Sequence, residues 1–165
     1  MKEPKSLNSV KEFHMLFRHP VLDTPQIPAA KRCALRVNLL SEELKEMEEA
    51  IAANDIVGVA DALADLQYVL AGAILEFGLG EKFADIFNEV QRSNMSKACK
   101  SEEEANATVD FYTKDKGEPH YWTKTGDDYL VYRTSDNKTV KSINYSPADL
   151  ASIVNREDVE ILVKN

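Results

Sequence analysis

The chain has 165 residues, of which 44% are apolar and 29% charged, a composition typical of one globular domain of ordinary size. Its net charge of −8 and pI of about 4.9 argue against a nucleic-acid polymer as partner, because binding a phosphate backbone requires a basic face. No apolar run approaches the roughly 20 residues of a membrane-spanning helix, so we expect no membrane partner. Two cysteines at no metal-binding spacing, and a first segment unlike a secretory signal, favour a reduced, cytoplasmic protein.

Apolar side chains spaced three and four residues apart predict four helices in the first hundred residues. We expect these helices over about residues 6–17, 28–53, 56–77 and 81–93. Prolines between the first two predict an extended connection there, and Asp55 is a suitable N-cap for the third helix. The third helix is apolar nearly all round except at its aspartates, which predicts burial on more than one side.

Short aromatic and β-branched runs after Lys100 predict strands separated by turns. The expected strands cover residues 108–112, 119–123, 129–134 and 139–143, followed by a short helix from Ser146-Pro147 to about Val154, with residues 159–163 as strand or tail. The predicted fold is therefore mainly α, an antiparallel four-helix bundle with a small C-terminal β-hairpin extension. We expect a helical domain over residues 1–100 and a β-rich extension of the same domain over residues 101–165.

Eight acidic residues and one lysine lie between Glu42 and Asp65, so this window carries −7 of the net charge of −8. Glu42, Glu43 and Glu46 are spaced to share one face of the second helix, and Asp61 and Asp65 one face of the third. The two aspartates lie in an otherwise apolar helix, where burial would be costly without a partner. Hard oxygen ligands of this kind suit Mg²⁺, with Mn²⁺ as a substitute. We therefore predict that these five acids form a metal site.

Carboxylates on paired helices serve two chemistries. A di-iron or di-manganese bundle needs Glu-x-x-His pairs, which these helices lack. Metal-assisted cleavage of a phosphate anhydride instead needs cations and donors for the phosphates. Residues 91–97, Gln-Arg-Ser-Asn-Met-Ser-Lys, offer such groups. Arg92 equally suits a helix C-terminus, and Tyr68 either packs or stacks on a base.

Three segments together resemble the all-α nucleoside triphosphate pyrophosphohydrolases, a superfamily that includes MazG, the phosphoribosyl-ATP pyrophosphohydrolases and the dimeric dUTPases. They are Glu-Glu-Leu-Lys-Glu at 42–46, Ala-Asp-Ala-Leu-Ala-Asp-Leu-Gln-Tyr-Val at 60–69 and Arg-Ser-Asn-Met-Ser-Lys at 92–97. The resemblance covers about residues 7–97, with a weaker similarity at 144–150. It implies a MazG-like fold and hydrolysis between the α and β phosphates to a nucleoside monophosphate and pyrophosphate.

The resemblance also implies roles for individual residues. Glu43 and Glu46 match the family's Glu-x-x-Glu motif and would be metal ligands, with one of them a base toward water. Asp65 matches the aspartate of the second motif, Glu-x-x-Asp, and completes the catalytic set. This chain has Ala62 at the glutamate position of that motif, and Asp61 is the expected substitute.

Asn94 and Lys97 match positions that contact substrate in relatives, and Arg92 and Tyr68 are further substrate candidates. The family implies a homodimer or homotetramer with sites at the subunit interface. Two alternatives stay open: a phosphoribosyl-ATP pyrophosphohydrolase, and a non-catalytic helical oligomer whose acids bind calcium or a basic protein. The aromatic hairpin is expected to be a small core or dimer contact, with a lid over the base as the alternative.

Overall fold

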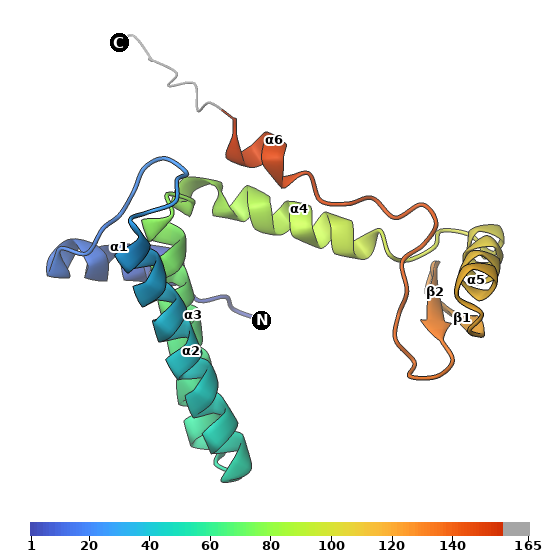
Figure 1. The fold of residues 1–165 in the computed structure, drawn as a ribbon, viewed down its shortest axis with the longest axis horizontal. Helices are drawn as coiled ribbons and strands as arrows, with labels where there is room; N and C mark the ends of the chain where they lie inside the picture. The colour runs from blue at the N-terminus through green and yellow to red at the C-terminus, as the bar shows by residue number, and fades with distance from the viewer. Residues whose placement is uncertain (157–165) are drawn as a thin grey trace. The chain divides into compact units, whose positions relative to one another are not determined.

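The computed structural model describes residues 1–156 and is mainly helical, with a two-stranded antiparallel hairpin near its C-terminus, as the sequence predicts (Figure 1). The described chain forms two compact units. The N-terminal unit comprises Met1–Phe83 with the described residues from Val154 onward, and the C-terminal unit comprises Ala84–Ile153. Residues 159–163, predicted as strand or tail, lie outside the described residues.

Three helices build the N-terminal unit: α1 (Ser6–Phe17), α2 (Ala30–Ala52) and α3 (Ile56–Glu76). Both α1 and α2 pack against α3, which lies beside α2 in Figure 1. A small core joins α1 to α3 through Val10, Ala71 and Leu75, with Leu7 and Val21 at its edge. The predicted bounds of these helices are confirmed to within two residues.

The connection between α1 and α2 runs along the C-terminal end of α3. The backbone N of Gln26 donates to the carbonyl of Phe77 at 3.1 Å. Gly78 follows α3 with a φ of +69°, and a Cβ there would lie 1.9 Å from the carbonyl oxygen of Thr24. Only glycine therefore allows the connection to approach this end of α3 so closely.

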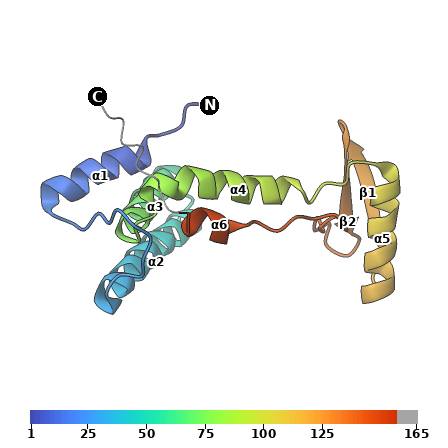
Figure 2. The same ribbon diagram turned by 90° about the horizontal axis from the view of Figure 1, so that it is seen from above.

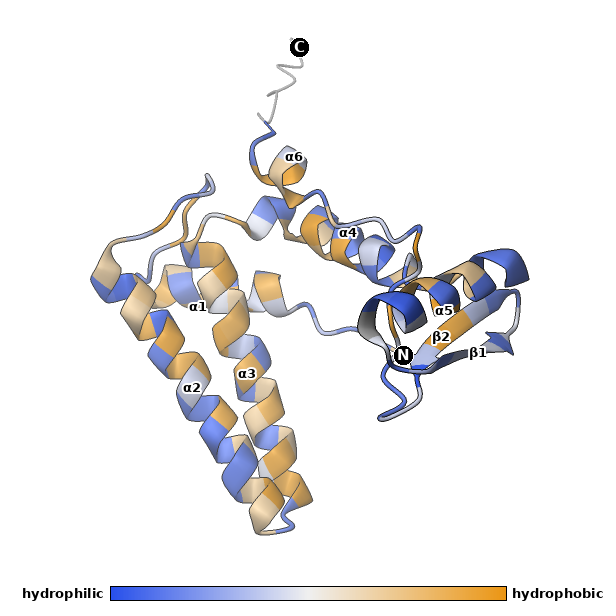
Figure 3. Ribbon diagram, turned by 45° about the vertical axis from the view of Figure 1, so that its right-hand side comes forward, coloured by the Kyte–Doolittle hydropathy of each residue, from blue (hydrophilic) through white to orange (hydrophobic). Residues whose placement is uncertain are grey.

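The apolar helix α3 is less buried than its sequence predicts. Figure 3 shows hydrophobic residues along most of its length. Ala62 and Ala71 are each 2% exposed, yet Leu63 is 51% and Leu70 46% exposed. The expectation of burial on more than one side is therefore wrong for the single chain.

Length and composition alone would allow α3 to cross a membrane, although the core helix of a soluble protein passes the same test. Helices α1 and α2 pack along α3 in this structure.

The C-terminal unit contains most of α4 (Phe83–Met95), then α5 (Glu102–Lys116) and the hairpin of β1 (His120–Thr125) and β2 (Asp128–Arg133). A 3-10 turn, η1 (Gly80–Lys82), precedes α4, and a short helix, α6 (Leu150–Val154), follows the hairpin. The strands pair antiparallel across a two-residue loop, and α5 packs on both of them (Figure 2). Buried Cys99, Ala105 and Val131 form the core of this unit, surrounded by Val109, Trp122, Tyr129 and Val140.

The strand predicted over residues 108–112 is wrong, because this segment lies inside α5. Ser101 caps the helix by accepting a hydrogen bond from the backbone N of Glu104 at 3.1 Å, and three glutamates occupy the first turn. The helix then continues through the β-branched and aromatic residues to Gly117, whose φ of +67° ends it. The capping signal outweighs the strand propensity of the segment.

Two further predictions in this unit need correction. Residues 139–143 make only an isolated bridge, between Thr139 and Tyr132, in place of a strand. The helix expected from Pro147 begins at Leu150, where the Asp149 side chain accepts from the backbone N of Ser152 at 3.2 Å.

Candidate active site

Helices α2 and α3 run antiparallel in a constant register. Contacts across the pair join Ala50 to Gly58, Arg36 to Gly72 and Arg32 to Glu76. Glu43 lies seven residues before Ala50, and Asp65 lies seven residues after Gly58. The same register therefore places Glu43 opposite Asp65. The acid motifs of the two helices are thus brought together in the middle of the pair.

Glu43 is the centre of this acid cluster, defined as Glu42, Glu43, Glu46, Asp61 and Asp65. Burial raises the pKa of Glu43, and the charges of Glu46, Asp65, Glu42 and Asp61 raise it further. Its Oε2 is buried and has no hydrogen-bond partner in the part of the chain that the structure describes. The other four carboxyl groups are exposed. The expectation that Asp61 and Asp65 are buried is therefore wrong for the single chain.

The acid cluster has the chemistry of a divalent-cation site. Among residues 1–156, no three His, Cys, Asp or Glu side chains lie close enough to hold a metal ion as they stand. The orphaned oxygen of Glu43 and the mutual repulsion of the carboxylates nevertheless fit a cation, because a positive charge would satisfy both. Its ligands would be Glu43, Glu46, Asp61 and Asp65, with Glu42 beside them, completed by water or phosphate oxygens.

A network of charged groups lies where the N-terminal part of α2 meets the C-terminal end of α3. There Arg32 and Arg36 of α2 bind Glu76 of α3. Arg36 Nη2 donates to Glu76 Oε1 at 2.5 Å, and Arg32 Nε donates to Oε2 at 3.1 Å. Glu76 is only 1% exposed and Arg36 only 7%. Burial acts to raise the pKa of Glu76, but hydrogen bonds from the two guanidinium groups outweigh it and the pKa is lowered.

His14 of α1 completes this network as a neutral imidazole. Its Nδ1 lies 2.9 Å from the carbonyl of Pro20, which can only accept, so Nδ1 carries the proton. Its Nε2 therefore accepts from Arg36 Nη2 at 3.0 Å. Burial lowers the pKa of His14. Gly72 leaves the space for both groups, since a Cβ there would lie 2.6 Å from Arg36 Nη1.

An aromatic cavity of about 230 Å³ lies between α1, α2 and α3, next to the acid cluster. Its lining includes the rings of Phe13, His19 and Tyr68, the apolar side chains Leu35, Leu39 and Val69, and Arg36. The Phe13 ring stacks on His19 at 5.8 Å between centroids and meets Tyr68 edge-on at 5.7 Å. Leu39 precedes Glu43 by one helical turn and Val69 follows Asp65 by one turn.

The expected phosphate-binding residues lie at the end of α4, in the C-terminal unit. Arg92 is already engaged, because its Nε and Nη2 each donate to Glu89 at 2.8 Å and Nη2 also donates to the carbonyl of Pro147. Hydrogen bonds from Arg92, and then from the backbone of Asp149, lower the pKa of Glu89 to about 2. Lys97 donates to Asn94 Oδ1 at 2.8 Å and forms no ion pair among the described residues.

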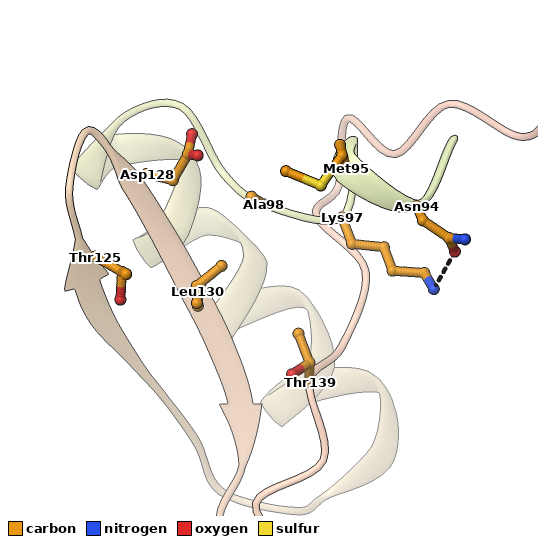
Figure 4. Close-up of a pocket in the computed structure, with 8 residues that line it drawn as sticks. All are labelled: Asn94, Met95, Lys97, Ala98, Thr125, Asp128, Leu130 and Thr139. Atoms are coloured by element: carbon orange, nitrogen blue, oxygen red, sulfur yellow. Dashed lines mark hydrogen bonds between the residues drawn. The ribbon is translucent and has the colours of Figure 1, made fainter. Parts of the chain in front are cut away.

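Asn94 and Lys97 line a pocket of about 440 Å³ that the hairpin helps to form (Figure 4). Thr125, Asp128 and Leu130 of the hairpin face it, with Thr139, Met95 and Ala98. Asp128 is neutralised by Lys100, whose Nζ lies 2.7 Å from its Oδ1. The half-buried Lys97 is thus available to an anion at the rim of this pocket.

A family model for phosphoribosyl-ATP pyrophosphohydrolase matches residues 10–94, more than half of the chain. The chain belongs to this family. It is a nucleotide pyrophosphohydrolase, a hydrolase that acts on phosphoric anhydrides, and the resemblance seen in the sequence is confirmed. Members of this pyrophosphohydrolase family typically use divalent metals. No curated protein sequence matches the chain.

The pyrophosphohydrolase match spans the acid cluster, the charged network and the aromatic cavity, and it ends at Asn94, before Lys97 and the hairpin. Sequence reasoning missed the network of Arg32, Arg36 and Glu76. Its signal was present, because the arginines lie four apart on the helical stripe that carries Glu43, and Glu76 is an acid in the last turn of an apolar helix. Their pairing depends on the α2–α3 register, which the sequence does not state.

Proposed function

We propose that this pyrophosphohydrolase cleaves nucleoside triphosphates between the α and β phosphates, releasing a nucleoside monophosphate and pyrophosphate. The acid cluster carries the proposal, since four carboxylates surround that of Glu43, whose buried Oε2 has no partner among the described residues. Mg²⁺ suits these ligands best, and Mn²⁺ would substitute for it. When bound, such a cation neutralises phosphate oxygens and lowers the pKa of the attacking water.

The residues of the chain have distinct roles in this proposal. Glu43, Glu46, Asp61 and Asp65 hold the cation, with Glu42 adding negative charge beside them. Water attacks the α-phosphorus, and the bond between this phosphorus and the oxygen that bridges it to the β-phosphorus breaks. The bridging oxygen leaves with pyrophosphate, and a proton of the water passes to a carboxylate of the acid cluster. Asn94 and Lys97 bind phosphate oxygens, and Tyr68 contacts the nucleoside.

We further propose that the enzyme is a homo-oligomer, either a dimer or a tetramer, and that it works in the cytoplasm. The exposed apolar residues of α2 and α3 support an oligomer, because patches of this kind mark protein interfaces. The sites would then lie where subunits meet, so that Lys97 and the acid cluster need not come from the same chain.

A panel assay tests the proposed function. Pyrophosphate and monophosphate release is measured for the canonical deoxy- and ribonucleoside triphosphates and for phosphoribosyl-ATP, with Mg²⁺, with Mn²⁺ and with chelator. We expect cation-dependent release from one or a few triphosphates. Release from phosphoribosyl-ATP alone would favour the second candidate, to which the description of the matching family points. Release from none would refute both.

A further inference from the structure

The aromatic cavity has the size and lining for one planar ring system. Its volume of about 230 Å³ falls below the roughly 300–1,000 Å³ of pockets that take drug-sized ligands. Phe13, His19 and Tyr68 present aromatic rings to it, and aromatic side chains are the usual stacking partners of nucleobases. A base fits this cavity, whereas a whole nucleotide would have to extend out of it.

Arg36, which lines the aromatic cavity, has a buried N–H that lacks an acceptor among the described residues. This N–H is that of Nε, and Arg36 is 7% exposed. The nearby acceptors are already used, because His14 Nε2 accepts from Arg36 Nη2 and both oxygens of Glu76 accept from arginine. A buried N–H left unpaired is costly, so a ligand that brings an acceptor would be stabilised there.

The position of the acid cluster determines which end of a bound nucleotide would face Arg36. Arg36 lies seven residues before Glu43 on α2, a rise of about 10 Å along the helix. If the phosphates lie at the acids, the edge of the base remote from the sugar points toward Arg36. That edge carries a carbonyl group in uracil, thymine, guanine and hypoxanthine, and an amino group in cytosine and adenine.

We propose that this cavity holds the base of the substrate and that Arg36 selects bases with a carbonyl group at the edge remote from the sugar. The inference rests on the proposed function and names its substrate class. An amino group at that edge would set donor against donor and leave both without a partner, which is how a polar site rejects a close analogue.

The test compares matched triphosphates that differ mainly at this edge: dUTP with dCTP, and dITP with dATP. We expect kcat/KM to favour the carbonyl member of each pair by about ten- to a hundredfold, the effect of one hydrogen bond to a charged group. Equal values, or a preference for the amino member, would overturn the inference and leave the proposed function standing. If no triphosphate is cleaved, the proposed function fails, and calorimetric binding of dUMP against dCMP decides the inference alone.

Two lysine variants test whether Arg36 is the source of the preference for a carbonyl group. Arg36→Lys keeps the positive charge and removes the Nε donor, so the carbonyl preference should fall to within about twofold. Arg32→Lys is the matched control, because it makes the same change against the same carboxylate, Glu76, while its Nε is already bonded. A preference that survives in both variants, each shown to be folded by circular dichroism, would overturn the role of Arg36.

A third variant covers the case in which Arg36→Lys does not fold. Tyr68 is 39% exposed and lines the cavity, so Tyr68→Leu should leave the fold intact. Loss of base stacking should raise KM several-fold for both members of a pair and leave their ratio unchanged. An unchanged KM would show that the base does not bind in this cavity.

Discussion

Glu46 and Asp65 are exposed carboxylates whose negative charges repel that of Glu43. We expect Glu46→Gln and Asp65→Asn each to reduce pyrophosphate release by at least about a hundredfold, because each removes a cation ligand, and to leave the circular dichroism spectrum unchanged. Glu48→Gln and Glu49→Gln are matched controls on the same helix and should retain activity. Wild-type turnover in either cluster variant would refute the assignment of the acids.

His14 should make the stability of the fold depend on pH. Its pKa is lowered from 6.5 by burial, so the unfolded chain takes up a proton at a higher pH than the folded chain does. The free energy of unfolding should therefore fall as the pH drops below about 6.5, by no more than about 1.4 kcal/mol per pH unit for one proton.

Thermal melts from pH 8 to pH 5.5 measure this dependence. His14→Gln keeps an acceptor for Arg36 and cannot be protonated, so it should flatten the dependence. His19→Gln, at an exposed position, is the control and should leave the pH dependence of the melting temperature unchanged. An equally steep dependence in His14→Gln would show that another group is responsible.

At the scale of single elements, the N-cap of α3 supports the helix that carries Asp61 and Asp65. Asp55 Oδ1 accepts from the backbone N of Val57 at 3.0 Å and of Gly58 at 3.1 Å. We expect Asp55→Ala to lower the free energy of unfolding by about 1 kcal/mol, measured by urea denaturation, and Asp55→Asn to retain most of it. Equal losses in both variants would indicate a role for the charge of Asp55 beyond capping.

The sequence predicted elements well where one local signal acts alone. The apolar spacing of α1, the prolines after it and the Asp55 cap gave bounds close to those observed. The segment at 108–112 combined strand propensity with an upstream cap at Ser101, and the helix prevailed. The acids within each motif were predictable as neighbours because each motif lies on one helix. The bonds of Glu76 were not predictable, because they depend on how two helices align.

At the scale of the whole molecule, exposed apolar residues recur every seven positions on both helices of the pair. They are Val37, Leu44 and Ile51 on α2, and Ile56, Leu63 and Leu70 on α3, each between 46% and 77% exposed. This spacing is that of a coiled-coil seam, which pairs with another helix. A second copy of the chain would supply two more helices and form a four-helix bundle with this pair, which differs from the bundle of four helices predicted within one chain.

Charged substitutions in this seam test the oligomer. Leu44→Glu and Leu63→Glu should convert the protein to monomers in size-exclusion chromatography with light scattering, and pyrophosphate release should fall with them. Leu16→Glu is the control, because Leu16 is 77% exposed on α1 and lies outside the seam. A monomeric wild-type protein would contradict the proposed oligomer.

The α2–α3 pair is fastened at both ends. A short turn at Asn54 joins the helices at one end, and the arginine bonds to Glu76, with Gly78 packed under Thr24, hold the other. The carboxylates lie between these fastenings, so the helices cannot spread apart to relieve their repulsion. The backbone of the pair is therefore in place before a cation binds, and only the carboxylate side chains have to move to reach it, at little cost in backbone order.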